Sequence, residues 1–465
     1  MILKFARIIK GRGALAKLGS DLAGRLLQYA LLWVAARQLS QGDFGDFTFA
    51  LSVGYMLAQV ADFGLQMFVQ RELARLLNTE RDGDAGFSDP NAAGRLIGGG
   101  LLIKGVLSVA AMLLIVAVVY VEPVGNRGAL VLLGLAMVLG TGLDYLSYCF
   151  RALGKLGWEA WAGLVWRVLN LALGVCMLVL GAGVWGLALA YVLATVGAIV
   201  LSYRLLLRYV RPVWRVDLAY WRGSLTQPTA VGIGVIFSII TFRLDNLLIP
   251  PLLGREALAV YNVAYKLFEP SLILPGVLLA ATFPLLARSA HAEALKPNAL
   301  RELLGQTTLA LLGLGVGAAL LLALLSGPLI GLLYGASYAA SAPILAWLAL
   351  ACVPMYINYG LTHALIAVDK PRLYALFTLV SLAVNLGLNL ALIPSMGLVG
   401  AALTTIAAEL VLLVLCAIAV YRHMGTLKSQ SAASITRGLL RANNPKSGYP
   451  LGDQNRQSAD LELPT

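Results

Sequence analysis

The feature that most constrains this chain is a series of long apolar runs, each about as long as a lipid bilayer is thick. A helix needs about 20 apolar residues to cross the hydrocarbon core. It satisfies its own backbone hydrogen bonds in lipid, and the runs lack the alternation of barrel strands. The runs lie at about 14–38, 44–70, 96–120, 128–150, 159–180, 184–207, 223–250, 257–287, 303–326, 342–368, 373–394 and 398–421. The sequence therefore predicts an all-α polytopic membrane protein with about twelve transmembrane helices.

The composition excludes a water-soluble enzyme. Hydrophobic residues make up 59% of the chain and charged residues 12%, whereas an ordinary soluble domain has about 25% charged residues. The four cysteines and three histidines have neither the spacing of metal ligands nor that of a disulfide framework. The sequence also contains no GxxxxGK[ST] loop for ATP. We therefore expect no catalytic residues, no metal and no cofactor.

Basic residues divide unequally between the two sides of the predicted membrane. With a cytoplasmic N-terminus, cytoplasmic segments carry 27 of the 35 Lys and Arg residues, and external segments carry only Arg37, Arg127 and Arg255. Cytoplasmic loops are rich in Lys and Arg, so the net charge of +12 requires no nucleic-acid partner. We expect both the basic N-terminus (1–13) and the polar tail (422–465) in the cytoplasm, and the tail without fixed structure.

The two halves of the chain resemble each other at an offset of 214 residues. The matched segments are LSQGDFGDFTFA (39–50) with LGREALAVYNVA (253–264), and GVWGLA (183–188) with GLVGAA (397–402). Such an offset holds six spans, so the predicted bundles, 14–222 and 223–421, share one orientation. Parallel repeats of this kind place a cleft between the bundles near the bilayer midplane, which favours a transporter over a channel or an anchor.

Charged residues inside the spans indicate where such a cleft would be. The basic ones are Arg25, Lys104, Arg167, Arg243 and Lys266, and the acidic ones are Asp62, Asp144, Asp245, Glu269 and Glu409. Each basic residue costs about 2.5–3.5 kcal/mol at a helix centre, so such groups normally face a cavity or a bundle interior. Arg25, Arg243 and Lys266 are the candidates for binding an anionic substrate, because guanidinium groups suit phosphate and pyrophosphate oxygens.

The acidic residues have two possible roles. Asp62, Asp245 and Glu269 are candidates either for binding a coupling ion or for neutralising a nearby cation. Lys266 and Glu269 are three residues apart and could pair on one helix face. Arg243 and Asp245 point about 200° apart on their helix, so each needs a partner elsewhere. Lys104 lies near a predicted helix end and could extend its amine to the interface.

Three stretches carry a resemblance to a known family. LGSDLAGRLLQYALLWVAARQLSQGDFGDFTFALS resembles the first two helices of Wzx-type polysaccharide or O-antigen flippases, members of the multidrug/oligosaccharidyl-lipid/polysaccharide (MOP) superfamily. FRLDNLLIPPLLGREALAVYNVAYKL resembles their seventh-to-eighth helix passage, and NLGLNLALIPSMGLVGAALTT their eleventh-to-twelfth. The resemblance extends over residues 14–421.

The resemblance implies twelve helices in two bundles around a V-shaped cavity that opens alternately to the two sides. It implies a flippase that moves undecaprenyl-pyrophosphate-linked oligosaccharide from the cytoplasmic to the outer leaflet of the bacterial inner membrane, for surface polysaccharide such as lipopolysaccharide or exopolysaccharide. Its partners would be this lipid-linked substrate, the bilayer and other polysaccharide-assembly membrane proteins. The family's cationic cavity corresponds to Arg25 and Arg243. Lipid II flippases usually have two further C-terminal helices, where this chain has its polar tail.

Two other functions remain as alternatives. An ion-coupled multidrug exporter of the same superfamily would be expected to have acidic rather than basic groups in its cavity. A membrane polysaccharide polymerase or ligase would be expected to have a large external loop with catalytic residues, and the predicted external loops are short. The sequence names neither the glycan nor the coupling ion.

Overall fold

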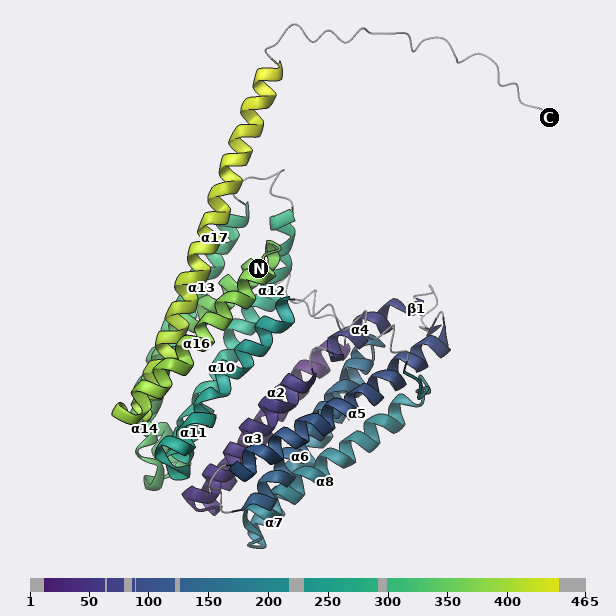
Figure 1. The fold of residues 1–465 in the computed structure, drawn as a ribbon, viewed down its shortest axis with the longest axis vertical. Coiled ribbons are helices and arrows are strands. Elements are labelled where there is room, and N and C mark those ends of the chain that lie inside the picture. Colours follow the sequence, from purple (N-terminus) through teal and green to yellow (C-terminus); the bar gives the residue numbers. More distant parts are fainter. Residues whose placement is uncertain are drawn as a thin grey trace, which may run out of the picture.

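The computed structural model describes residues 12–62, 65–78, 86–87, 89–121, 126–216, 230–291 and 299–442. These residues form helices, together with one short antiparallel pair of strands, β1 (Leu77–Asn78) and β2 (Gly86–Phe87). The helices form two bundles that meet at one end of the molecule and diverge toward the other (Figure 1). This arrangement confirms the all-α fold expected from the apolar runs.

The N-terminal bundle is coloured purple to blue-green in Figure 1. Its helices are α2 (Arg12–Gln38), α3 (Gln41–Asp62), α4 (Leu65–Arg75), α5 (Pro90–Val121), α6 (Arg127–Ala152), α7 (Leu156–Val179) and α8 (Gly183–Leu206). Helix α2 packs on α7, and α6 packs on both α3 and α8. The buried core of this bundle is aliphatic and aromatic, with Phe47 and Phe49 completely enclosed.

The C-terminal bundle is coloured teal to yellow in Figure 1. Its elements are α10 (Ala230–Leu253), α11 (Arg255–Phe268), the short 3₁₀ helix η1 (Glu269–Leu272), α12 (Ile273–His291), α13 (Ala299–Tyr334), the 3₁₀ helix η2 (Ala336–Tyr338), α14 (Ser341–Leu350), α15 (Cys352–Ala367), α16 (Pro371–Met396) and α17 (Leu398–Ala442). Helix α16 packs on α10 and α17, and α13 packs on α14 and α15.

Local sequence explains where several of these helices begin and end. Helix α16 starts at Pro371, since a proline in the first turn loses no hydrogen bond. It ends before Gly397, whose φ of 61° only glycine adopts readily. The run predicted as one helix over 257–287 is divided by η1, because Pro270 has no N–H with which to continue the α-helix.

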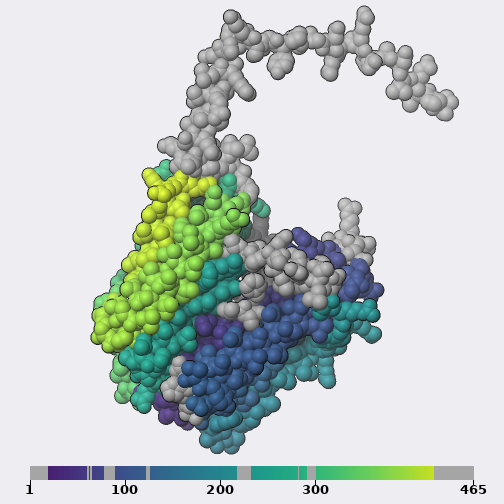
Figure 2. All heavy atoms as spheres, viewed as in Figure 1, coloured from purple at the N-terminus to yellow at the C-terminus, as the bar shows by residue number. Residues whose placement is uncertain are grey.

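The two bundles meet mainly through α3 on α11 and α10. The amide of Asn262 donates to the hydroxyl of Thr48 at 3.1 Å, and these two residues are 214 positions apart, the offset of the internal repeat. Equivalent residues meet in this way when a twofold axis passes between two repeats. The contact supports the parallel repeat, which stays a prediction in its full extent. Figure 2 shows the blue atoms of one bundle against the teal atoms of the other.

Polar side chains close the end at which the bundles meet. Arg37 donates to the carbonyls of Leu332 and Leu333 at 3.1 and 2.9 Å, and Gln41 donates to the carbonyl of Ser337 at 2.5 Å. Helix α2 begins and α17 ends at the opposite, divergent end (Figure 1). If both termini are cytoplasmic, as the charge distribution predicts, the divergent end of the two bundles faces the cytoplasm.

Ten helical segments in the described part of the chain are long and apolar enough to cross a membrane. Helices α2 and α3, at the positions of the first two predicted spans, are 27 and 22 residues long but are not among the ten. Both carry charged side chains; Arg25 on α2 faces the central cavity and Asp62 on α3 packs against α5. The count of twelve spans therefore stays a prediction.

One expectation about the polar segments needs correction. Helix α17 continues to Ala442, so the prediction that the tail lacks fixed structure was wrong for residues 422–442, while 443–465 lie outside the described residues. The polar stretch between the second and third apolar runs (71–95) is also partly helical, because α4 continues to Arg75 and α5 begins at Pro90. The N-terminal residues 1–11 also lie outside the described part.

Candidate functional site

A cavity of about 460 Å³ lies between the two bundles, lined mainly by α2, α3, α6 and α7 on one side and by α10, α11 and η1 on the other. Its basic residues are Arg25, Arg151, Arg167, Arg243 and Lys266, and its acidic residues are Asp144, Glu159 and Glu269. Five cations and three anions leave the lining with a net positive charge. All three substrate-binding candidates from the sequence are among these residues.

Two of these candidates share one carboxylate. Glu269 has one oxygen 3.3 Å from Nη2 of Arg243 and the other 2.7 Å from Nζ of Lys266. The pairing of Lys266 with Glu269 at a spacing of three residues is the one that the sequence suggested. Glu269 stands at the start of η1, directly after the last residue of α11. Tyr55 of the other bundle lies 5.6 Å from the guanidinium of Arg243.

Arg25 faces these groups from the N-terminal bundle. Its side chain lines the cavity and is exposed there, and among the described residues it makes no ion pair within 4 Å. It interacts electrostatically with Glu269. Arg25, Arg243 and Lys266 with the single carboxylate of Glu269 therefore form a cluster with two positive charges in excess. We call these four residues the cationic cluster.

The other cations of the cavity are held by local carboxylates. Arg167 lies 3.8 Å from Asp21, and Arg151 lies 2.5 Å from the buried Glu159. Sequence reasoning placed Arg151 in a cytoplasmic loop, because the apolar run ends at about residue 150. The helix continues through Ala152, and the side chain of Arg151 therefore lines the cavity. Nothing in the sequence pattern indicated this position.

Gly24 explains how Arg167 fits against α2. A Cβ atom at this position would lie 2.2 Å from Cδ of Arg167, so a larger residue would require the arginine side chain to move from its observed position. Gly24 therefore lets Arg167 lie across α2 one residue before Arg25. This close approach brings a second arginine to the same wall of the cavity.

Aromatic and amide side chains line the rest of the cavity. These residues are Gln28, Tyr29, Tyr55, Gln59, Tyr148, Trp166 and Tyr191. Tyr and Trp side chains have flat apolar ring faces and a polar hydroxyl or N–H group, and amide groups both donate and accept hydrogen bonds. Such a surface suits a polar ligand with apolar C–H faces. Sequence reasoning missed these residues because aromatic side chains in apolar runs usually belong to a core.

Asp62 and Lys104 lie apart from this cavity. Lys104 donates to Asp62 in an ion pair between α5 and α3, with 6% and 7% of the two side chains exposed. The expectation that Lys104 reaches the interface was wrong. Its amine is instead buried in this ion pair. Asp62 therefore acts in charge pairing in this structure.

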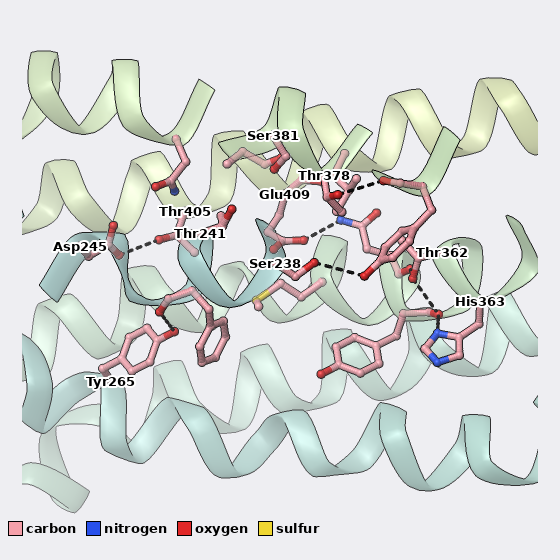
Figure 3. A pocket seen from close by; sticks show the side chains of 18 residues that line it. Ser238, Thr241, Asp245, Tyr265, Thr362, His363, Thr378, Ser381, Thr405 and Glu409 are labelled. Atoms are coloured by element: carbon pink, nitrogen blue, oxygen red, sulfur yellow. Dashed lines mark hydrogen bonds between the residues drawn. The ribbon is translucent and has the colours of Figure 1, made fainter. Parts of the chain in front are cut away.

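Asp245 faces a second pocket, of about 250 Å³, inside the C-terminal bundle (Figure 3). Its carboxylate accepts hydrogen bonds from the hydroxyl of Tyr261, from Nδ2 of Asn389 at 2.8 Å and from the hydroxyl of Thr405 at 3.3 Å. No basic side chain lies within 4 Å of it among the described residues. Arg243 and Asp245 thus face different cavities, in keeping with the opposite directions that their spacing predicted.

The described residues contain no cluster of three or more His, Cys, Asp and Glu side chains that could hold a metal ion. The cysteines Cys149, Cys176, Cys352 and Cys416 are all free. The polar chemistry of the described part is therefore concentrated in the cationic cluster, the second pocket and the buried ion pairs.

Comparisons with solved structures show the fold. An inward-facing multidrug resistance MATE family transporter of the MOP superfamily matches with a TM-score of 0.72 and 16% identity, over 87% of this chain and 96% of that one. The outward-facing conformation of such a transporter matches with a TM-score of 0.60 and 15% identity, over 91% and 98%. The lipid II flippase MurJ in an inward closed conformation matches with 0.67 and 12% identity, over 91% and 92%.

Comparisons of the sequence show the family. No curated protein matches the chain. A model of the lipid II flippase MurJ family matches residues 233–440, and a model described as polysaccharide biosynthesis protein matches residues 11–290, more than half of the chain. This chain is therefore a membrane protein of the polysaccharide biosynthesis family, with the fold of the MOP superfamily.

Proposed function

We propose that this protein flips undecaprenyl-pyrophosphate-linked oligosaccharide from the cytoplasmic to the outer leaflet of the bacterial inner membrane. The observation that carries the proposal is the cationic cluster at the junction of the two bundles. A pyrophosphate that joins a lipid to a sugar carries one negative charge on each phosphate. Arg25, Arg243 and Lys266 with Glu269 offer two positive charges in excess, which matches this group.

The geometry of the cluster suits an alternating mechanism. Arg25 belongs to one bundle, and Arg243 and Lys266 belong to the other, so a bound pyrophosphate would bridge the two. Arginine binds phosphate oxygens with two parallel hydrogen bonds. Glu269 holds the two cations of the C-terminal bundle when the substrate is absent, and the pyrophosphate would compete with it. Movement of the bundles would then carry the head group from one side to the other.

The aromatic and amide lining supplies a place for the sugars. Tyr148 and Trp166 lie in the N-terminal bundle together with Gln28 and Gln59. Sugar rings have apolar faces that pack on aromatic rings and hydroxyls that bond amides. We assign the oligosaccharide to this side of the cavity and the pyrophosphate to the cationic cluster.

Multidrug export is the second candidate, because an inward-facing MATE transporter has the same fold with a TM-score of 0.72. A cationic drug would meet a lining with five basic and three acidic residues. The excess of positive charge disfavours such a substrate and favours an anionic one. An assay of dye efflux from cells separates the two functions.

We further propose that Asp245 couples transport to a proton or Na⁺. Of the three carboxylates that the sequence offered for this role, Asp62 pairs with Lys104 and Glu269 pairs with two cations. Asp245 has hydroxyl and amide donors but no cation beside it within the described residues. Its pocket lies inside one bundle, so a bound ion could bias the movement without touching the substrate.

The test uses purified protein in vesicles with a lipid-linked oligosaccharide on one face. Arg25→Ala and Arg243→Ala should each reduce flipping at least about tenfold, and Lys at either position should restore it only partly, since an ammonium lacks the planar fork. The control is Arg127→Ala, which removes an exposed arginine at the start of α6. Full flipping by both alanine variants would refute the assignment of the cationic cluster.

The same vesicles test the coupling. Flipping should slow when the proton and Na⁺ gradients and the membrane potential are collapsed, and Asp245→Asn should remove this dependence while basal flipping persists. Rates that do not respond to the gradients in the unmodified protein would show that Asp245 has a structural role. In cells, deletion of the protein should leave the lipid-linked sugars on the cytoplasmic face.

A further inference from the structure

A second carboxylate faces the pocket inside the C-terminal bundle. Glu409 and Thr405 both lie on α17 and line this pocket with Asp245 (Figure 3). Glu409 comes four residues after Thr405, which places it about 6 Å farther along the helix axis. Because α17 runs from the junction of the bundles toward their divergent end, Glu409 lies nearer than Asp245 to the predicted cytoplasmic side.

Asn358 is the hydrogen-bond partner of Glu409. Its Nδ2 atom donates to the carboxylate at 2.6 Å and to the backbone carbonyl of Glu409 at 2.8 Å. Both hydrogens of the amide are therefore used, which fixes the orientation of the side chain. Asn358 is only 3% exposed, and its Oδ1 atom has no hydrogen-bond partner. A buried acceptor without a donor is costly, and Asn358 lines the same pocket as the carboxylate.

The hydroxyl groups around Glu409 add further acceptors rather than donors. Thr362 donates to the carbonyl of Asn358 at 2.6 Å, Thr378 to that of Tyr374 at 3.0 Å, and Ser381 to that of Ala408 at 3.0 Å. A hydroxyl has one hydrogen, so each of these oxygens offers only lone pairs for a further contact. An anion would find few donors here, whereas a small hard cation would find several oxygen ligands.

No cation of the protein fills this place. Among the described residues, no Lys or Arg side chain lines the pocket. The titratable groups that face it from the neighbouring helices are Tyr359 and His363 on α15, Tyr374 on α16, Asp245 on α10 and Tyr265 on α11. Nδ1 of His363 lies 2.7 Å from the carbonyl of Tyr359, and its ring stacks on that of Tyr359 at 6.3 Å.

We propose that Glu409 and Asn358 form a second binding position for a monovalent cation, Na⁺ or a proton. It lies between Asp245 and the cytoplasm, so an ion released from Asp245 would bind there before it leaves. The inference extends the proposed coupling at Asp245 by giving the ion a path within the C-terminal bundle, separate from the substrate cavity. The position itself needs no substrate, so it can be tested without flipping.

The experiment measures ion binding to the purified full-length protein in lipid nanodiscs without substrate. Equilibrium binding of ²²Na⁺ at alkaline pH is compared for the unmodified protein, Glu409→Gln, Asp245→Asn and the double variant. We expect each single variant to lose one bound ion per chain and the double variant to lose both. The matched control is Glu302→Gln, which removes an exposed carboxylate from α13 of the same bundle and should bind as the unmodified protein does.

A second measurement distinguishes a proton from Na⁺. Infrared difference spectra recorded between acidic and alkaline pH report protonated carboxyl groups. If the ion is a proton, Glu409→Gln should remove one carboxyl band that Asp245→Asn leaves in place. If the ion is Na⁺, Glu409→Gln should instead lose one bound ²²Na⁺ per chain in the equilibrium binding measurement. The proposal is overturned when Glu409→Gln matches the unmodified protein in both measurements, or when Asp245→Asn alone removes all ion binding.

One further variant tests whether a loss of binding comes from misfolding, and one further outcome distinguishes this proposal from the proposed function. Asn358→Leu removes the orphaned acceptor and keeps the carboxylate, so it should weaken binding at this position about tenfold or more while the protein stays monodisperse. Unchanged affinity in this variant would also count against the position. A protein that binds both ions but fails to flip the lipid-linked sugar would refute the proposed function and leave the cation position standing.

Discussion

Replacing Gly45 with alanine should weaken the contact that holds the two bundles together. Gly45 lies on α3, where it faces the backbone of α11, and a Cβ atom there would lie 2.0 Å from the carbonyl oxygen of Arg255. Ordinary contact begins at 3.4 Å, so the two helices would have to separate by about 1.4 Å. The obstacle is backbone rather than a flexible side chain, and it cannot rotate away.

The cost of this separation follows from the packing of cores. Forcing an extra methyl group into a tight contact costs about 1–3 kcal/mol, which corresponds to a change of about 5- to 150-fold in a two-state equilibrium. The contact exists only when the bundles meet at the predicted external end. Gly45→Ala should therefore shift the population from the observed arrangement toward one that is open at that end.

Gly42→Ala is the matched control. Gly42 lies on the same helix, and its added Cβ would meet only the hydroxyl of Ser40, at 4.0 Å. Both substitutions replace a glycine of α3 with alanine, so the main difference between them is the clash with α11.

The assay is a distance measurement between spin labels on cysteines introduced at Arg127 and Ala340, which are exposed on the two bundles near the closed end. We expect a longer distance to gain population in Gly45→Ala and the unmodified distribution in Gly42→Ala. Identical distributions in the two variants would refute the reasoning, because the clash would then have been absorbed without movement of the bundles.

Three other predictions follow from the charged residues and from the orientation. Lys104→Met should lower the free energy of unfolding by about 3–5 kcal/mol, because it leaves Asp62 buried without a partner. Adding Asp62→Leu should recover most of this loss, as measured by thermal unfolding, and a double variant as unstable as the single one would contradict the prediction. Glu269→Gln should tighten binding of inorganic pyrophosphate by about fivefold or more in calorimetry, since one anion is removed beside two cations; unchanged affinity would speak against the cationic cluster. A reporter fused after residue 425 should be cytoplasmic and one within 251–256 external, and the reverse result would refute the even number of spans.

Much of the architecture could be predicted because lipid imposes its own rules on a sequence. Long apolar runs must become helices in a bilayer, and the structure has helices at each of these runs. Spacing along a helix also predicted local geometry: Lys266 and Glu269 pair at three residues apart, and Arg243 and Asp245 point in different directions, which the structure shows to be toward different cavities. The intramembrane charges pointed to the cavity because a charge in lipid is too costly to leave unsolvated.

The partners of those charges were decided only by the tertiary structure. Helical periodicity says which face of a helix a side chain occupies, but not which helix lies opposite. Asp62 and Lys104 are 42 residues apart, and their pairing requires the packing of α3 on α5. Arg25 and Glu269 line the same cavity only because the two bundles meet. The sequence alone therefore determined that this protein spans a membrane and carries charge within it, whereas the packing of helices across the bundle junction determined which charges neutralise each other and which remain for a substrate.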